Sequence, residues 1–189
     1  MSLSRRQVVA GVIAEAGDAL VIAGLGTPCW DLYETGDRPE FFYMWNAMGL
    51  TVPAGLGLAL AQPGRKVLVV TGDGDMMMGI GSLAVIGSQA PANLGILVLD
   101  NEMFGETGGQ AGLTSRGADI AAIARGAGIA QAVTVRTPDE CEGLAGFLLG
   151  GGGPALAVAK VAASKDPARY PSRDGAMLAN RFRAAASGR

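Results

Sequence analysis

The sequence predicts an α/β fold, a three-layer sandwich with a mostly parallel central sheet. Strand-like apolar segments alternate with helical segments along the whole chain, and strands separated by helices form parallel sheets with helices on both faces. The stretch 66–71 is almost continuously apolar, as is typical of a strand buried on both faces. Hydrophobic residues make up 49% and charged residues 17% of the 189 positions, which excludes disorder and favours one core.

The expected elements follow one another in a regular order. Apolar residues at helical spacing predict a first helix over about 4–16, and the strand 19–24 then ends in a glycine-rich turn, 24–28. The rest of the pattern predicts helix 30–34, strand 41–45, helix 51–61, strand 66–71, helix 77–88, strand 94–99, a glycine-rich loop at 101–112, helix 118–127, strand 131–135, helix 138–149 and strand 154–161.

Two regions are expected from this pattern. The alternating elements make one domain, residues 1–161. The remaining segment, 162–189, has a different composition and ends in a helix near 174–186. We expect this segment to be a surface arm that docks on another subunit.

Charge and composition exclude several classes of protein. Fifteen basic against seventeen acidic side chains give a net charge of −2, so a nucleic acid partner is not expected. The chain has no histidine, which excludes Ser-His-Asp and Cys-His catalysis within it and argues against the usual zinc sites. Any bound metal should therefore be a hard cation held by oxygen.

The expected location is the cytoplasm. The two cysteines, Cys29 and Cys141, are far apart in sequence and fit a reducing compartment. The start of the chain, with Arg5 and Arg6 before an apolar stretch, resembles a twin-arginine export signal, but Glu15 and Asp18 interrupt it and favour an amphipathic helix. No apolar run reaches the roughly twenty residues that a membrane span needs, so no membrane association is expected.

Nucleotide-binding motifs are present only as weak matches. Gly79 and Gly81 fit the dinucleotide pattern G-x-G-x-x-A, but they lie well after the end of the preceding strand, so close helix packing explains them better. Gly24 and Gly26 do follow a strand, yet Cys29 replaces the third glycine. The sequence has no P-loop motif.

A stronger signal comes from polar residues at the ends of two neighbouring strands. Asp73 stands between Gly72 and Gly74 after one strand, and Asn101 follows the next. Because ligands bind at the carboxyl ends of the strands in such sheets, these side chains are expected to meet there. Carboxylate and amide oxygens suit Mg²⁺, and a glycine-rich rim beside a helix N-terminus suits phosphates. The pattern predicts a site for Mg²⁺ and a diphosphate.

At these residues the sequence resembles a known family. Gly72-Asp73-Gly74 followed by Asn101 is similar to the GDG…N signature of thiamine-diphosphate enzymes. The stretch 101–110, NEMFGETGGQ, resembles the corresponding segment of phosphonopyruvate and sulfopyruvate decarboxylases. The turn 46–49 is similar to their G-S-M-G turn, and the helix 119–125 matches one of theirs. The resemblance covers about 20–160 and implies the diphosphate-binding domain of that family.

The resemblance also implies roles for individual residues. Asp73 and Asn101 would bind Mg²⁺ through their side chains and Met103 through its carbonyl, while Met48 would support the bent thiamine. Asp75 departs from the small residue of many relatives, and we expect it to cap the helix 77–88. The implied contacts to thiamine diphosphate are Gly26, Thr27, Ala47, Met48, Gly72, Gly74, Asp75, Met76, Met103, Phe104 and Thr107.

The function implied by the resemblance is the Mg²⁺-dependent decarboxylation of a small 2-oxo acid. No catalytic residue is expected in this chain, because the activating glutamate belongs to a pyrimidine-binding α subunit, in a dimer, an α₂β₂ or a larger assembly. Arg116 and Arg125 are candidates for binding the acidic group of the substrate. Two alternatives stay open, the cofactor-binding chain of a 2-oxoacid:ferredoxin oxidoreductase and a non-catalytic or flavodoxin-like binding module.

Overall fold

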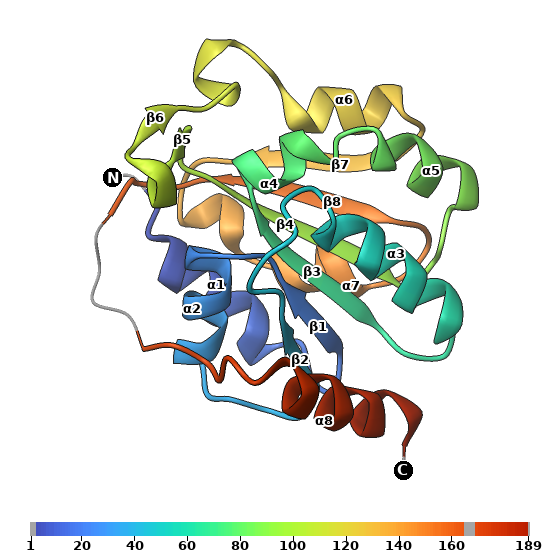
Figure 1. Ribbon diagram of the computed structural model, residues 1–189. Helices are drawn as coiled ribbons and strands as arrows, with labels where there is room; N and C mark the ends of the chain where they lie inside the picture. The colour runs from blue at the N-terminus through green and yellow to red at the C-terminus, as the bar shows by residue number, and fades with distance from the viewer. Residues whose placement is uncertain (1–2, 165–168, 189) are drawn as a thin grey trace.

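A six-stranded parallel sheet lies between two layers of helices in the computed structural model, which describes residues 3–164 and 169–188 (Figure 1). The strand order is β2-β1-β3-β4-β8-β7, and every neighbouring pair runs parallel. This confirms the predicted α/β sandwich. The strands are β1 (Leu20–Ala23), β2 (Phe41–Tyr43), β3 (Val67–Gly72), β4 (Leu94–Asp100), β7 (Gln131–Val135) and β8 (Ala155–Lys160).

The helices connect these strands, and a short antiparallel hairpin is added after β4. The hairpin strands are β5 (Met103–Phe104) and β6 (Gln110–Ala111). The α-helices are α1 (Arg5–Ala14), α2 (Thr27–Glu34), α3 (Thr51–Ala61), α4 (Asp73–Met78), α5 (Ser82–Gln89), α6 (Ile120–Gly126), α7 (Leu144–Leu149) and α8 (Gly175–Ser187).

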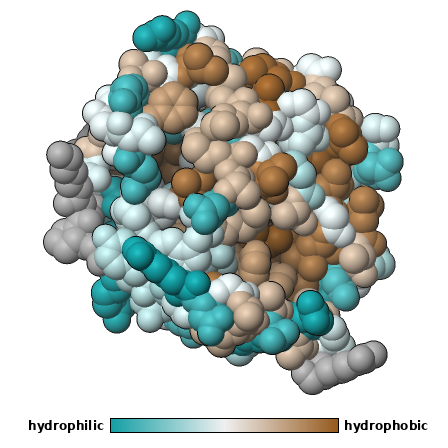
Figure 2. Space-filling view, in the orientation of Figure 1, coloured by the Kyte–Doolittle hydropathy of each residue, from teal (hydrophilic) through white to brown (hydrophobic). Residues whose placement is uncertain are grey.

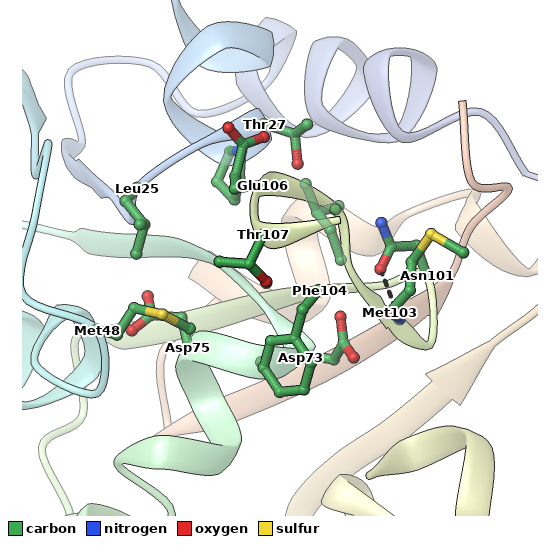
Figure 3. Close-up of a pocket in the computed structure, with 15 residues that line it drawn as sticks. Leu25, Thr27, Met48, Asp73, Asp75, Asn101, Met103, Phe104, Glu106 and Thr107 are labelled. Carbon is green, nitrogen blue, oxygen red and sulfur yellow. Dashed lines mark hydrogen bonds between the residues drawn. The ribbon is translucent and has the colours of Figure 1, made fainter. Parts of the chain in front are cut away.

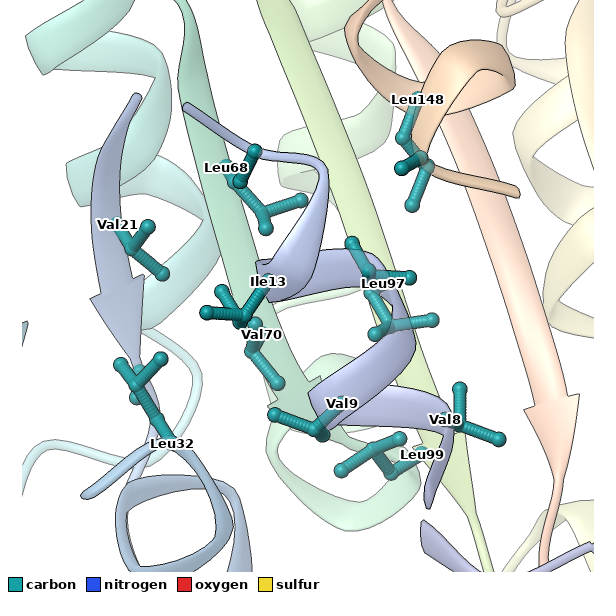
Figure 4. Close-up of a cluster of buried hydrophobic side chains, with 14 of the residues drawn as sticks. Val8, Val9, Ile13, Val21, Leu32, Leu68, Val70, Leu97, Leu99 and Leu148 are labelled. Atoms are coloured by element: carbon teal, nitrogen blue, oxygen red, sulfur yellow. The ribbon is translucent and has the colours of Figure 1, made fainter. Parts of the chain in front are cut away.

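Each face of the sheet has its own buried core, because alternate side chains of a strand point to opposite faces. Leu68 and Val70 of β3 join a cluster with residues of α1, α2 and α7, and Figure 4 shows this cluster. Val67 and Val69 of the same strand face α3, α4, α5 and α6. The continuously apolar stretch of the sequence is therefore a strand buried on both sides.

The region after β3 differs from the prediction of one helix over 77–88. Helix α4 begins at Asp73, directly after the strand, and a break at 79–81 separates it from α5. A Cβ atom on Gly79 would lie 2.1 Å from the carbonyl oxygen of Gly49, which confirms close packing as the reason for this glycine. Nothing lies within 4 Å of the corresponding position on Gly81, so close packing does not explain the second glycine.

The sequence predicted that the segment ending in helix α8 docks on another subunit. In the structure, α8 packs against this chain itself. The rings of Phe182 and Phe42 lie 5.4 Å apart, and Arg181 forms an ion pair with Asp37 at 2.6 Å. These contacts place α8 against the edge strand β2 (Figure 1). Part of the predicted arm, 165–168, lies outside the described residues.

The helices of this fold are short. None of those in 3–164 and 169–188 combines the length and the apolar character that a membrane crossing requires.

Candidate functional site

A pocket opens at the carboxyl ends of β1, β3 and β4 (Figure 3). It encloses about 640 Å³, including space open to solvent. The chain reverses its direction of winding here, because β2 lies on one side of β1 and β3 on the other, and such points are where α/β sheets bind ligands. The predicted site residues that line the pocket are Thr27, Met48, Gly72, Asp73, Gly74, Asp75, Asn101, Met103, Phe104 and Thr107.

The base of the pocket is held together by the Asp75 carboxylate. Its Oδ2 accepts hydrogen bonds from the hydroxyls of Thr51 and Thr71, both at 2.6 Å. Its Oδ1 accepts one from the amide of Gly49 at 2.6 Å. The prediction that Asp75 caps the following helix is wrong, since Asp75 lies inside α4 and its oxygens bind groups of α3 and β3 instead.

The hydrogen bond from the Gly49 amide to Asp75 fixes the turn that presents Met48 to the pocket. Ala47 and Gly49 both have positive φ, 72° and 84°, so the backbone beside Met48 is sharply turned. A Cβ on Gly74 would lie 3.6 Å from Met48 Cε and 2.6 Å from a ring carbon of Phe104. The side chains of Met48 and Phe104 therefore lie over Gly74, and only glycine allows the Phe104 ring so close to the backbone.

The predicted metal ligands come from two neighbouring strand ends. Asp73 follows β3 and is 3% exposed, and a Cβ on Gly112 would lie 2.8 Å from its Oδ2. Burial, together with the nearby charge of Asp100, raises the pKa of Asp73 to about 6. A buried carboxylate beside a second one is the kind of environment that a divalent cation stabilises.

Asn101 and Met103 lie opposite Asp73, after β4. The Asn101 Oδ1 accepts a hydrogen bond from the Met103 amide at 3.1 Å, which is shown dashed in Figure 3. In the described part of the chain, no group of three or more His, Cys, Asp or Glu side chains could hold a metal ion. A metal here would therefore combine one carboxylate with amide and carbonyl oxygens, a donor set that fits Mg²⁺.

The third wall of the pocket is the segment that includes the β5–β6 hairpin. Thr107 donates a hydrogen bond to Gln110 at 2.9 Å, and the Gln110 amide returns one to the Thr107 carbonyl at 2.7 Å. Glu106 reaches across to α2, since a Cβ on Gly26 would lie 3.1 Å from Glu106 Cγ. Gly26 is the N-terminal cap of α2 and has φ 73°. Because glycine has no side chain, the first amides of α2 receive no hydrogen bond from a capping side chain.

Several predicted residues lie outside the pocket lining. Gly26 and Ala47 only adjoin residues that line it. Met76 is 1% exposed and lies in the core between the sheet and helices α3 to α6. Neither Arg116 nor Arg125 lines the pocket, and Arg125 instead donates to the Ala132 carbonyl at 2.8 Å. Contacts of Gly26, Ala47 and Met76 to a cofactor stay predictions.

Sequence reasoning missed other residues of the site. Leu25, Pro28, Leu99, Gly105 and Glu106 also line the pocket. Leu25 lies in the glycine-rich turn after β1 and Pro28 in the first turn of α2, so the position of that turn at a strand end was the available signal. Behind Asp73 lie Asp100, Gly112, Thr114 and Lys160. No local pattern connects those four positions, because they meet only through the order of the strands.

Comparison with known protein families identifies the family of this chain. Residues 29–159 match the family model described as "Thiamine pyrophosphate enzyme, C-terminal TPP binding domain". The chain belongs to this family. The match spans α2 to β8 and includes most of the residues that line the pocket.

Relatives with named activities support the same assignment. The chain is 40% identical over 168 residues to a phosphonopyruvate decarboxylase of Streptomyces viridochromogenes, covering 88% of this chain and 42% of that protein. It is 42% identical over 110 residues to a sulfopyruvate decarboxylase subunit beta of Methanothermobacter thermautotrophicus, covering 58% of this chain and 59% of that protein. The corresponding subunit of Methanocaldococcus jannaschii is 34% identical over 139 residues, or 73% of each chain.

Solved structures agree on the fold. A protein of known structure from Mycobacterium smegmatis superimposes with a TM-score of 0.73 at 24% identity, covering 85% of this chain and 32% of that one. The chain thus spans roughly a third to three quarters of the proteins described here.

Proposed function

We propose that this chain binds thiamine diphosphate and Mg²⁺ and forms the cofactor-binding part of a 2-oxo acid decarboxylase of the sulfopyruvate or phosphonopyruvate type. The observation that carries the proposal is the meeting of Asp73, Asn101 and Met103 at one pocket, in a chain of the thiamine pyrophosphate family. When bound, the cofactor would supply an electron sink for the electron pair that stays on the substrate carbon when carbon dioxide leaves.

The residues of this chain would bind and orient the cofactor and its metal, and they would not transfer protons. Asp73, Asn101 and the Met103 carbonyl would hold Mg²⁺, and the glycines at 72 and 74 would allow the diphosphate to approach the backbone. Met48 and Phe104 supply the apolar surface beside that site. Thr27 and Thr107 also line the pocket, and Gly26 adjoins Thr27, so these three residues would contact the diphosphate.

The composition of the pocket supports the need for a partner. Among the described residues, no lysine or arginine lines it, although a substrate with a carboxylate and a second acidic group needs cationic partners. Of the described residues that line the pocket, Glu106 alone is a glutamate, and its side chain lies against Gly26, the N-terminal cap of α2. We therefore infer that a pyrimidine-binding subunit supplies both the activating glutamate and the cations for the substrate.

The surface near the pocket offers a place for that subunit. Large apolar side chains are exposed at Leu50, Met78 and Leu113, by 54%, 63% and 50%. Figure 2 shows hydrophobic surface gathered over the side of the molecule formed by α3 to α6. We propose a hetero-oligomer, α₂β₂ or larger, acting in the cytoplasm.

Calorimetric titration with thiamine diphosphate, with and without Mg²⁺, tests the binding part of the proposal. We expect saturable binding that requires the metal, and metal-independent binding or none at all would contradict it. Carbon dioxide release from sulfopyruvate and phosphonopyruvate then tests the reaction. Full turnover by the purified single chain would contradict the two-subunit proposal, while electron transfer from a 2-oxo acid to ferredoxin in the assembled complex would favour the oxidoreductase alternative.

A further inference from the structure

A chain of polar contacts lies directly behind the candidate metal ligands. Asp100 ends β4, Lys160 ends β8, and the two residues are paired in register across the sheet. The Lys160 ammonium lies 2.8 Å from Asp100 Oδ2 and 2.6 Å from Glu102 Oε1. Asp100 is only 2% exposed, so Lys160 compensates a carboxylate that is removed from water.

The other oxygen of Asp100 anchors two parts of the segment that carries the ligands. Its Oδ1 accepts a hydrogen bond from the Glu102 amide at 3.0 Å and one from the Thr114 hydroxyl at 2.8 Å. The Thr114 hydroxyl also lies 3.3 Å from Asp73 Oδ2. Thr114 thus connects the carboxylate after β3 with the one that ends β4.

The backbone held in this way has an unusual conformation. Glu102, between Asn101 and Met103, has φ 63°, a left-handed conformation that residues other than glycine adopt uncommonly. Its amide binds Asp100, and its carbonyl accepts a hydrogen bond from the Gly112 amide at 2.7 Å. Loss of the Asp100 anchor would therefore free the backbone to relax and would shift both neighbouring oxygen donors.

Neither Lys160 nor Thr114 lines the cofactor pocket. Both line a second cavity of about 560 Å³ on the far side of Asp100, together with Arg136 and Asp119. Their effect on the pocket must pass through Asp100 and the segment after β4.

We propose that Lys160 and Thr114 are positioning residues for the metal. Lys160 holds Asp100 in place and so fixes the backbone from which Asn101 and Met103 present their oxygens, and Thr114 fixes Asp73 relative to that backbone. This inference rests on the proposed function, because it assumes that Asp73, Asn101 and Met103 bind Mg²⁺. According to this proposal, the ion pair of Asp100 and Lys160 outside the pocket controls the affinity for the metal and not the binding of the substrate.

The first test titrates MgCl₂ into the full chain in the presence of thiamine diphosphate. We expect Lys160→Met and Thr114→Val to need about 10-fold to 100-fold more Mg²⁺ for half-maximal cofactor binding, the effect of losing a partner behind a metal ligand. At saturating Mg²⁺ the affinity for thiamine diphosphate should return to that of the wild type. Thr114→Ser keeps the hydroxyl and should restore Mg²⁺ affinity, and Lys66→Met, an exposed site at the opposite edge of the sheet, is the matched control.

The second test needs no cofactor. Amide hydrogen exchange of Glu102 should become about tenfold faster in Lys160→Met and remain unchanged in Lys66→Met, because a charge-assisted anchor is lost. Unchanged exchange in a folded Lys160→Met protein would overturn the proposal, as would unchanged Mg²⁺ dependence. A raised KM for the 2-oxo acid with normal Mg²⁺ affinity would also overturn it, by showing that Lys160 contacts the substrate. If the wild type itself binds thiamine diphosphate without Mg²⁺, the proposed function fails, whereas the exchange measurement still decides whether Lys160 anchors this backbone.

Discussion

The Asp75 carboxylate accepts a hydrogen bond from the Thr71 hydroxyl at 2.6 Å, across the junction where β3 passes into α4. Both residues are buried, and the same carboxylate also binds the Thr51 hydroxyl and the Gly49 amide. This arrangement explains why an acidic residue is tolerated beside the proposed diphosphate site. Its oxygens are occupied by donors of the protein.

Asp75→Asn should lower the free energy of unfolding by about 1–3 kcal/mol, because it replaces three hydrogen bonds to a charged carboxylate with weaker neutral ones. The Thr51 and Thr71 hydroxyls can turn to accept from the new amide group, but their own protons then lose this acceptor. Urea unfolding measures the change. Asp139→Asn, at an exposed position, is the control. Equal stability of the two variants would show that the three hydrogen bonds contribute no net stabilisation.

Asp73→Asn should weaken the binding of thiamine diphosphate in the presence of Mg²⁺ by about 10-fold to 100-fold or more. It should not lower stability, because it removes a buried charge beside Asp100 that burial already disfavours. Calorimetry and a melting curve on the same sample test both parts. A variant that binds normally would remove Asp73 from the metal site.

Asn101→Ala should raise the Mg²⁺ concentration for half-maximal cofactor binding by about tenfold or more. The fold should remain, at a cost of about 0.5–1.5 kcal/mol for the lost hydrogen bond to the Met103 amide. Circular dichroism checks the fold and calorimetry the binding. Unfolding of the variant, with normal cofactor binding by the fraction that stays folded, would make Asn101 a structural turn residue only.

Gly79→Ala should destabilise the protein by about 1–3 kcal/mol, because its methyl group would lie 2.1 Å from the Gly49 carbonyl oxygen. Gly81→Ala is the matched control, since its backbone is helical, with φ −61°, and its surroundings are open. That control should be neutral or stabilising by up to about 1 kcal/mol. Similar losses in both variants would contradict the packing explanation.

The ion pair that holds α8 should depend on pH. Burial raises the pKa of Asp37, but hydrogen bonds from Arg181 and Tyr43 and the Arg181 charge outweigh it and hold that pKa below its ordinary value. The resulting stabilisation is present above about pH 4, the unfolded value, and is lost as the pH falls through the folded value. We expect a gap of about 0.5–1 kcal/mol between the wild type and Asp37→Asn at pH 6. Unfolding curves from pH 6 down to pH 2.5 should show the gap closing, and a constant gap would contradict the assignment.

The strand pattern was predictable because both faces of this sheet are covered. Val67 and Leu68 point to opposite cores, so a continuous apolar run identified β3 without further information. The same logic placed Asp73 and Asn101 at one edge, since β3 and β4 are neighbours in the sheet as well as in the chain.

Two features depended on contacts that no local pattern specifies. The pair Asp100 and Lys160 exists because β8 lies beside β4, whereas alternating strands and helices leave strand order open. The early start of α4 depends on Asp75, whose hydrogen bonds to Thr51 and Gly49 stabilise a helical turn where the sequence DGD favoured an irregular loop. In both cases tertiary contacts override local preference.

The pairing of Leu3 with Val161 has a practical consequence for working with this protein. It places Leu3 directly after β8, on the same edge of the sheet as the pocket, while α8 lies against β2 (Figure 1). An affinity tag or fluorescent label joined ahead of Leu3 would lie on the side of the sheet where the proposed partner subunit would bind. A label attached beyond α8 would leave that side clear, so immobilisation for surface plasmon resonance should use the carboxyl end of the chain.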